Sequence, residues 1–259
     1  MIEQPIEIKR KHPWDDTIRT ILVAFLLAVG FRSFVFEPFH IPSGSMKSTL
    51  LVGDYLFVSK YSYGYSRYSF PLGLPLFHGR VLELSKPARG DVVVFRPPGS
   101  PRVDFIKRVI GLPGDRIQLK DGIVYINDVP LARQPLGTFA DDEDLSHINV
   151  IPRFAETLPG GKVISILKEP HDVQHVDATH TADDTPVYQV PPGYYFMMGD
   201  NRDHSYDSRF PSGVSYVPEE NIVGRAEMIF LSVDSSFTWT NPASWFTAMR
   251  FDRFFKVIE

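Results

Sequence analysis

Residues 17–36 form the most apolar run of the chain, and this run limits the possible folds more than any other feature. Its uncharged centre, residues 20–31, would rise only about 18 Å as a helix, whereas the apolar core of a bilayer is about 30 Å thick. Arg19 and Arg32 flank this centre, and their charged ends can extend toward the lipid headgroups. We therefore predict that residues 17–36 are a retained transmembrane anchor.

A basic cluster at residues 9–11 lies within the polar segment 1–16, just before the apolar run. Basic residues beside a membrane span stay on the cytoplasmic side. The sequence thus predicts a single-pass protein of the inner (plasma) membrane, with a cytoplasmic amino terminus and the remainder on the periplasmic or extracellular side. A cleaved signal peptide is an alternative, but its small residues, Ala28 and Gly30, lie inside the run and bulky residues follow. A buried core helix is the second alternative.

The rest of the chain has the composition of a β protein. The 22 prolines and 20 phenylalanines among 259 residues fit extended segments better than a helical bundle. There is no cysteine, which excludes disulfides and thiolate chemistry, and the net charge of −4 argues against nucleic acid as a partner. Apolar or alternating segments bounded by turn residues predict a hairpin at 117–129 and strands within 53–60, 90–95, 103–110, 194–198 and 222–233.

These segments divide the chain into regions. Residues 37–130 and 190–233 hold the predicted strands and form a β core. Residues 131–189 differ in character and contain a hairpin turn at 159–161, so we interpret them as an inserted second β subdomain. Residues 234–259 are a tail rich in aromatic and basic side chains. The predicted fold class is mostly β, with one amino-terminal transmembrane helix.

Two serines, Ser43 and Ser45, flank Gly44 in a tight loop shortly after the apolar run. Such a loop can expose one serine and direct a second hydroxyl and a backbone N–H to the same point. A serine hydroxyl is a weak nucleophile until a base removes its proton. A catalytic Ser45 therefore needs a base elsewhere in the chain.

Lys107 is the candidate base. Alternation along residues 103–110 places Lys107 on one face of a strand with Val103, Phe105 and Val109, where it is the only charge. Burial disfavours the ammonium form and lowers the pKa of a lysine from its usual value of about 10.4. A neutral amine is then available as a general base. The ordinary alternative is an edge-strand lysine that extends its charge into water.

The polar segment 199–209 directly follows the apolar strand predicted at 194–198. A segment this polar is normally a surface turn. After an apolar strand it can equally be a polar network packed against a site.

Four sequence blocks, in this order, resemble the motifs of the type I signal peptidase family: residues 42–46, 53–55, 107–115 and 199–209. The amino-terminal anchor fits the same pattern. The resemblance implies a membrane-bound serine endopeptidase that removes amino-terminal signal peptides from exported preproteins and cuts after small residues, as in Ala-x-Ala. It implies a Ser–Lys dyad with no cofactor and no metal, preproteins and the lipid bilayer as partners, and a monomer.

The same resemblance assigns the reacting groups. Ser45 is the nucleophile and Lys107 the base. The Ser43 hydroxyl and the Ser45 N–H form the oxyanion hole, where donors meet a charge that develops only in the transition state.

Four further residues are assigned a supporting role by the resemblance. Ser205 holds the amine of Lys107, and Asp207 with Arg209 braces that loop as an ion pair. Arg108 is grouped with them, although alternation places it on the strand face opposite Lys107. The ordinary alternatives are a turn serine and a solvated ion pair of little consequence.

Two other functions fit parts of the sequence. His171 and His175 are four residues apart and suggest a metal hydrolase, but Pro170 precedes them and Asp172 stands where a zinc protease has glutamate. A non-enzymatic, membrane-anchored β-domain is the other alternative. In such a domain, Lys107 is an ordinary protonated lysine.

Overall fold

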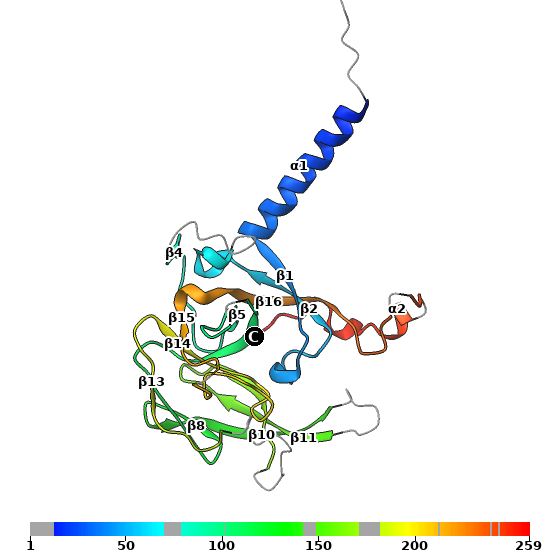
Figure 1. Ribbon diagram of the computed structural model, residues 1–259. Coiled ribbons are helices and arrows are strands. Elements are labelled where there is room, and N and C mark those ends of the chain that lie inside the picture. The colour runs from blue at the N-terminus through cyan, green and yellow to red at the C-terminus, as the bar shows by residue number, and fades with distance from the viewer. Residues whose placement is uncertain are drawn as a thin grey trace, which may run out of the picture.

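The computed structural model describes residues 13–69, 79–100, 102–141, 149–170, 182–211, 213–238, 240–242 and 244–259. One long helix, α1 (Pro13–Phe34), precedes the β part of the chain and projects away from it, with only its last turn against the β part (Figure 1). Within it, Asp16–Phe34 is long and apolar enough to cross a membrane. The predicted span of 17–36 is wrong at its end, because the helix stops at Phe34 and Phe36 already belongs to a strand.

The described residues form four antiparallel sheets. The largest has the order β1-β2-β16-β5-β6-β14-β15, and the others have the orders β13-β7-β8-β9, β10-β11-β12 and β3-β4. The mostly β fold class is thus confirmed. The elements after α1 are β1 (Phe36–His40), β2 (Asp54–Ser59), β3 (Tyr65–Ser66), β4 (Arg80–Val81), β5 (Val92–Phe95), β6 (Phe105–Gly111), β7 (Arg116–Lys120), β8 (Ile123–Ile126), β9 (Val129–Pro130), β10 (Ala132–Asp141), β11 (Asn149–Thr157), β12 (Val163–Leu167), β13 (Tyr188–Gln189), β14 (Tyr194–Met198), β15 (Val217–Pro218), β16 (Ile222–Ser232) and the short helix α2 (Ser244–Thr247).

Most predicted strands are present with small shifts at their ends. All four residues of β5 are buried, as its continuous apolar sequence predicted. The strand predicted at 103–110 is β6, which begins only at Phe105, because Val103 is 52% exposed and lies before the sheet. The predicted hairpin at 117–129 is β7–β8. Its two turn residues, Asp121 and Gly122, both have positive φ (48° and 70°), which matches the twist of paired strands.

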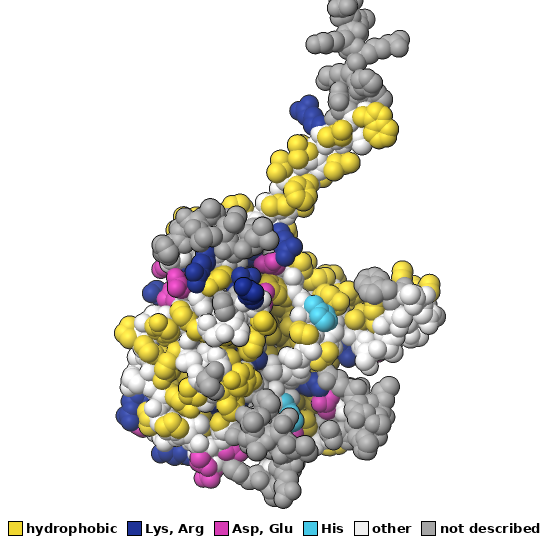
Figure 2. Space-filling view, viewed as in Figure 1, with side chains coloured by type: hydrophobic (Ala, Val, Ile, Leu, Met, Phe, Trp, Pro, Cys, Tyr) yellow, Lys and Arg dark blue, Asp and Glu magenta, His cyan; other side chains and the backbone are white. Residues whose placement is uncertain are grey.

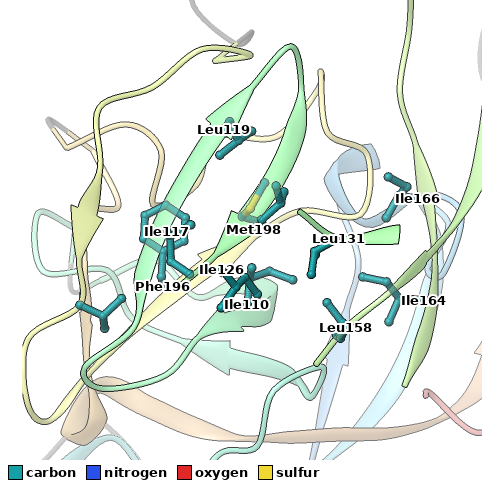
Figure 3. Packing of buried hydrophobic residues seen from close by; sticks show 12 residues of the cluster. Ile110, Ile117, Leu119, Ile126, Leu131, Leu158, Ile164, Ile166, Phe196 and Met198 are labelled. Carbon is teal, nitrogen blue, oxygen red and sulfur yellow. The ribbon is translucent and has the colours of Figure 1, made fainter. Parts of the chain in front are cut away.

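A shared hydrophobic core joins three of the four sheets (Figure 3). Ile110 of β6 and Phe196 of β14 come from the large sheet, Ile117 from β7, and Ile164 and Ile166 from β12. All five side chains are almost fully buried. The strands within 131–189 therefore pack on the large sheet through one core, which fixes their position relative to β6 and β14.

The tail, residues 234–259, folds back on the large sheet. Arg253 is buried and forms an ion pair with Asp54 of β2, with its Nε 3.0 Å from Oδ1. Ile258 packs against the core cluster of β2, β5 and β16. Phe246 and Phe255 remain exposed on the outer side. The tail therefore stabilises the strand that follows the Ser45 loop.

Candidate active site

Ser45 lies in a short 3₁₀ helix, Gly44–Met46, on the loop that follows β1. Ser43 precedes this helix with an extended backbone (φ −136°, ψ 151°), and the N–H of Lys47 closes the turn on the Gly44 carbonyl at 3.1 Å. Ser45 is buried, whereas Ser43 is exposed and does not cap the helix with its side chain. The first N–H groups of a helix have no acceptor within it. The loop therefore presents two hydroxyls and backbone donors together.

Lys107 reaches Ser45 from β6. Its Nζ lies 2.5 Å from the Ser45 Oγ, and both residues are buried. Burial lowers the pKa of Lys107 to about 8, while the more distant carboxylates of Asp207 and Asp200 act in the opposite direction. The predicted pair is thus in contact, and its amine is easier to deprotonate than that of an ordinary lysine.

The segment 199–209 is a buried network and not a surface turn. Asp207 and Arg209 form an ion pair with an Nε–Oδ1 distance of 2.8 Å, and neither side chain is exposed. Asp207 also accepts hydrogen bonds from the Gly199 N–H (3.0 Å) and the Ser205 hydroxyl (2.7 Å). Burial disfavours a charged Asp207, but Arg209 and these donors outweigh it and hold the pKa of Asp207 below its usual range. The alternative of a solvated pair is therefore wrong.

Ser205 has a different partner from the one that the resemblance implies. Its hydroxyl is fully buried and donates to Asp207, and within the described residues it makes no hydrogen bond to Lys107. A Cβ atom on Gly199 would lie 2.2 Å from the Ser205 Oγ and 2.5 Å from the Ser45 carbonyl oxygen. Ser205 and the Ser45 backbone thus pack on either side of a position that only glycine fits.

Arg108 is almost fully buried on the face opposite Lys107. Its guanidinium forms two hydrogen bonds to Asp200, at 2.8 and 2.7 Å, and donates to the carbonyls of Gly90 (2.7 Å) and Glu259 (2.8 Å). The alternation of side chains along the strand correctly predicted that Arg108 lies on the face opposite Lys107, but it did not predict the ion pair with Asp200. The pair ties β6 to the polar segment that follows β14, so Arg108 can support Lys107 only through the backbone.

Two residues beside the serine loop were missed by the sequence analysis. Asn201 donates its N–H to the Ser45 carbonyl (3.1 Å) and its side-chain amide to the Gly44 carbonyl (3.2 Å). Lys47 is buried and forms an ion pair with Asp141 at the end of β10, at 2.7 Å. Asn201 lies in the polar segment already singled out, but Lys47 and its partner are 94 residues apart and no pattern links them.

A cavity of about 390 Å³ opens in front of Ser45 and Lys107, on a face that is visibly hollowed (Figure 2). On the cavity side, β6 pairs with β14 only from Arg108 onward, although β5 pairs with it from Phe105. Among the described strands, the first residues of β6 therefore have one unpaired backbone edge next to Ser45. The other residues that line the cavity are Phe39, His40, Ile41, Pro42, Ser43, Val94, Val103, Asp104, Phe105, Ile106, His204 and Tyr206.

The histidines of the predicted metal alternative, His171 and His175, lie outside the described residues. In the part of the chain that the structure describes, no group of three or more histidine and carboxylate side chains is placed to hold a metal ion.

The fold and this site define a class of protein: a hydrolase with a mostly β domain that follows one apolar helix. In its site, the Ser45 hydroxyl contacts the buried Lys107 amine, whose pKa is lowered. Such a pair can perform acyl transfer by nucleophilic attack. Residues 14–231 match the family model described as signal peptidase, peptidase S26. The chain therefore belongs to this family, and it is a serine endopeptidase that removes signal peptides.

The relatives from Rickettsia agree with this membership. The chain is 40% identical over 258 residues to signal peptidase I of Rickettsia conorii, which covers 95% of this chain and 92% of the relative. It is 41% identical over 242 residues to signal peptidase I of Rickettsia typhi, covering 89% and 88%. A crystal structure of a signal peptidase I from Enterococcus faecalis aligns with a TM-score of 0.32 and 24% identity, over 54% of this chain and 97% of that one.

Proposed function

We propose that Ser45 and Lys107 are the catalytic dyad of this endopeptidase, and the 2.5 Å contact between them is the observation that carries the proposal. The Ser45 Oγ attacks the carbonyl carbon of the scissile peptide while the neutral amine of Lys107 accepts the hydroxyl proton. The resulting ammonium gives that proton to the leaving amine as the C–N bond breaks. Water then attacks the acyl ester, with Lys107 again as the base, and Ser45 is regenerated.

The oxyanion of each tetrahedral intermediate accepts hydrogen bonds from the Ser45 N–H and the Ser43 hydroxyl. Ser43 lines the cavity and is not used as a helix cap, which leaves its hydroxyl able to turn toward the substrate. Donors that are already in place lower the barrier because they need no reorganisation when the charge develops.

The buried polar network holds the dyad in place. Asp207 and Arg209 fix the segment that contacts Ser45, and Ser205 acts through Asp207 and by packing. Segments 37–130 and 190–233 supply all these residues and form the catalytic core, whereas 131–189 supports it from the side. Because the proposed site is complete within one chain, it supports a monomeric enzyme.

The apolar helix supports a membrane location for the enzyme. We propose that α1 spans the bilayer once, with the basic residues 9–11 on the cytoplasmic side and the catalytic domain on the outer side of the plasma membrane. A signal peptide held in the same bilayer presents its cleavage site to the cavity from the membrane side.

The substrate binds as an added strand. The unpaired edge of β6 before Arg108 can form main-chain hydrogen bonds to an extended segment that enters the cavity. Successive side chains of such a segment point in opposite directions. The first and third residues before the cut therefore face the same wall, and the second faces away.

This arrangement predicts a position-dependent exclusion of large side chains. A peptide with Phe in place of Ala at the first position before the cut should lose kcat/KM at least about a hundredfold, because the family resemblance implies cleavage after small residues and a ring would displace the scissile bond from the dyad. Phe at the second position should be tolerated within about threefold, since that side chain points away from the wall. Efficient cleavage after Phe at the first position, measured by mass spectrometry of the products, would contradict the proposed binding mode.

The lowered pKa of Lys107 predicts the pH dependence of the reaction. A lysine whose folded pKa is depressed is protonated, and inactive as a base, below that pKa. We expect kcat/KM to rise through a single ionisation centred at about pH 8, with a tenfold loss for each pH unit below it. The measurement is kcat/KM from pH 6 to 10 on an uncharged peptide. A rising limb centred near 10.4 would mean an exposed lysine and would remove the proposed base.

The pH dependence of the melting temperature is the control for the profile of kcat/KM against pH. Between the folded pKa of Lys107 and its unfolded value, the unfolded chain binds more protons than the folded one, so this lysine makes stability rise with pH in that window. The melting temperature should therefore not fall as the rate increases. Increasing the salt concentration should shift the limb little, because burial and not surface charge lowers the pKa.

A further inference from the structure

The chain passes from the apolar helix to the catalytic domain almost without a linker. α1 ends at Phe34 and β1 begins at Phe36, so Val35 alone lies between them. β1 pairs with β2 along its whole length, and the loop with Ser45 follows it. The path from the membrane helix to the nucleophile therefore runs through paired strand and a bonded loop, not through a flexible tether.

Backbone carbonyls at the end of α1 are bonded to the β domain. The Tyr65 hydroxyl donates to the Phe34 carbonyl at 2.7 Å, and the Lys60 N–H donates to the Val35 carbonyl at 3.2 Å. A helix that ends in solvent would leave such carbonyls to water. Ser33, in the last turn, is buried, and the rings of Phe34 and Tyr65 meet edge to face at 5.6 Å. The helix end is thus docked and oriented.

The carboxylate of Glu37 links the end of α1 to the β domain. Arg32, in the last turn of α1, donates its Nε and Nη2 to one oxygen of Glu37 at 3.0 and 2.7 Å, and the Nζ of Lys60 lies 2.9 Å from the other. Lys60 is buried, and charged side chains gather where the helix meets the β domain (Figure 2). Charge-assisted bonds from two elements to one carboxylate resist rotation of the helix against the domain.

We propose that this junction, residues 32–37 together with Lys60 and Tyr65, is a rigid spacer that sets the height of the active site over the bilayer and so selects the bond that is cut. The proposal rests on the anchoring of α1 in the membrane proposed above. A preprotein whose apolar segment lies in the same bilayer presents its peptide bonds at fixed heights. Only the bond level with Ser45 meets the dyad in a reactive geometry. A short soluble peptide has no such restriction.

The test lengthens the spacer in the full chain. Gly-Gly-Ser is inserted between Val35 and Phe36, and the enzyme is reconstituted into vesicles of phosphatidylcholine and phosphatidylglycerol. Its substrates are a preprotein embedded in the same vesicles and a soluble peptide with the same cleavage sequence. We expect kcat/KM to stay within about twofold for the peptide and to fall at least about tenfold for the preprotein, with displaced cuts found by mass spectrometry.

One further junction variant and two matched controls separate an effect of spacing from damage to the domain. The same insertion between Gly160 and Gly161 lies in the exposed turn between β11 and β12. It should leave kcat/KM unchanged for both the preprotein and the peptide. Glu37→Gln should reproduce the preprotein-selective loss, whereas Arg116→Gln, which breaks an exposed pair with Asp128, should not.

An equal loss of kcat/KM for both substrates would contradict the proposal that the junction is a spacer. An unchanged rate and cleavage site for the preprotein would contradict it as well. Peptide cleavage that persists in Ser45→Ala would instead contradict the proposed dyad, so the two failures are distinguishable.

Discussion

Ser45→Ala and Lys107→Met are each expected to lower kcat by at least about a thousandfold, and the double variant is expected to be little worse than either single one. The hydroxyl and the amine act in one proton transfer across the 2.5 Å contact, so removing either stops the same step. The measurement is single-turnover cleavage of a model preprotein in detergent. Losses that simply multiply in the double variant would show that the two residues act independently.

Matched variants show whether these losses are chemical. Ser100→Ala and Lys120→Met make the same changes at exposed positions and should keep full activity. Lys107→Met also removes a buried amine, and a methionine of similar length fills the same apolar space. Its melting temperature should therefore not fall. A lower melting temperature of Lys107→Met would contradict the expected fit of methionine, and retained activity in a folded Lys107→Met would contradict the assignment of Lys107 as the base.

The face of Lys107 could be predicted, but its contact could not. Period-two alternation is local and correctly grouped Lys107 with Phe105 and Val109. Ser45 lies 62 residues earlier, and nothing in the spacing of the two residues brings them together. In the large sheet, β2, β16 and β5 lie between β1 and β6, so the contact between the loop after β1 and Lys107 of β6 exists only in the folded chain. The pattern of the residues made Lys107 a candidate base, and the resemblance to a family paired it with Ser45.

The end of the membrane helix shows why boundaries are harder to predict than elements. Val35 and Phe36 are as apolar as the helix before them, so hydropathy alone extends the helix through them. In the structure they belong to the junction and to β1, where the Phe36 ring packs on Tyr61 at 5.7 Å. An apolar residue can be buried by lipid or by protein, and its sequence does not distinguish the two.

Apart from Asp207–Arg209, the buried ion pairs of this region could not be predicted, because their partners are distant in sequence. Arg108 and Asp200 are 92 residues apart, and Arg202 bonds to Glu156 of β11 across 46 residues. A run of charged residues such as 199–209 is usually solvated. Here it is buried because each charge finds a fixed counter-charge, which only the folded chain provides.

The fully buried pair of Asp207 and Arg209 leads to the second large effect. Asp207→Asn and Arg209→Met should each destabilise the protein by about 3–5 kcal/mol, because each leaves one charge buried without its counter-charge. In a domain of this size, the melting temperature should fall by about 10 °C. The control is Asp128→Asn, which breaks an exposed pair with Arg116 and should cost less than about 0.5 kcal/mol.

The pH dependence of this stabilisation has a defined sign. The folded pKa of Asp207 is lower than its unfolded value of about 3.9. Its contribution is therefore fully present above that unfolded value and is lost only as the pH falls through the folded pKa. Between pH 6 and 10, the direct contribution of the Asp207 carboxylate should be constant, and the stability difference between wild type and Asp207→Asn should change only where the pKa of Lys107 differs between the two proteins.

The two variants should move the activity profile in opposite directions. The charge of Asp207 raises the pKa of Lys107, and the charge of Arg209 lowers it. Asp207→Asn should therefore shift the rising limb of kcat/KM below the wild-type position, and Arg209→Met should shift it above. General damage to the fold would lower the rate in both variants without moving the limb in opposite directions. Two shifts of the same sign, in profiles recorded at a temperature where both variants are folded, would show that the pair does not act on Lys107 through its charges.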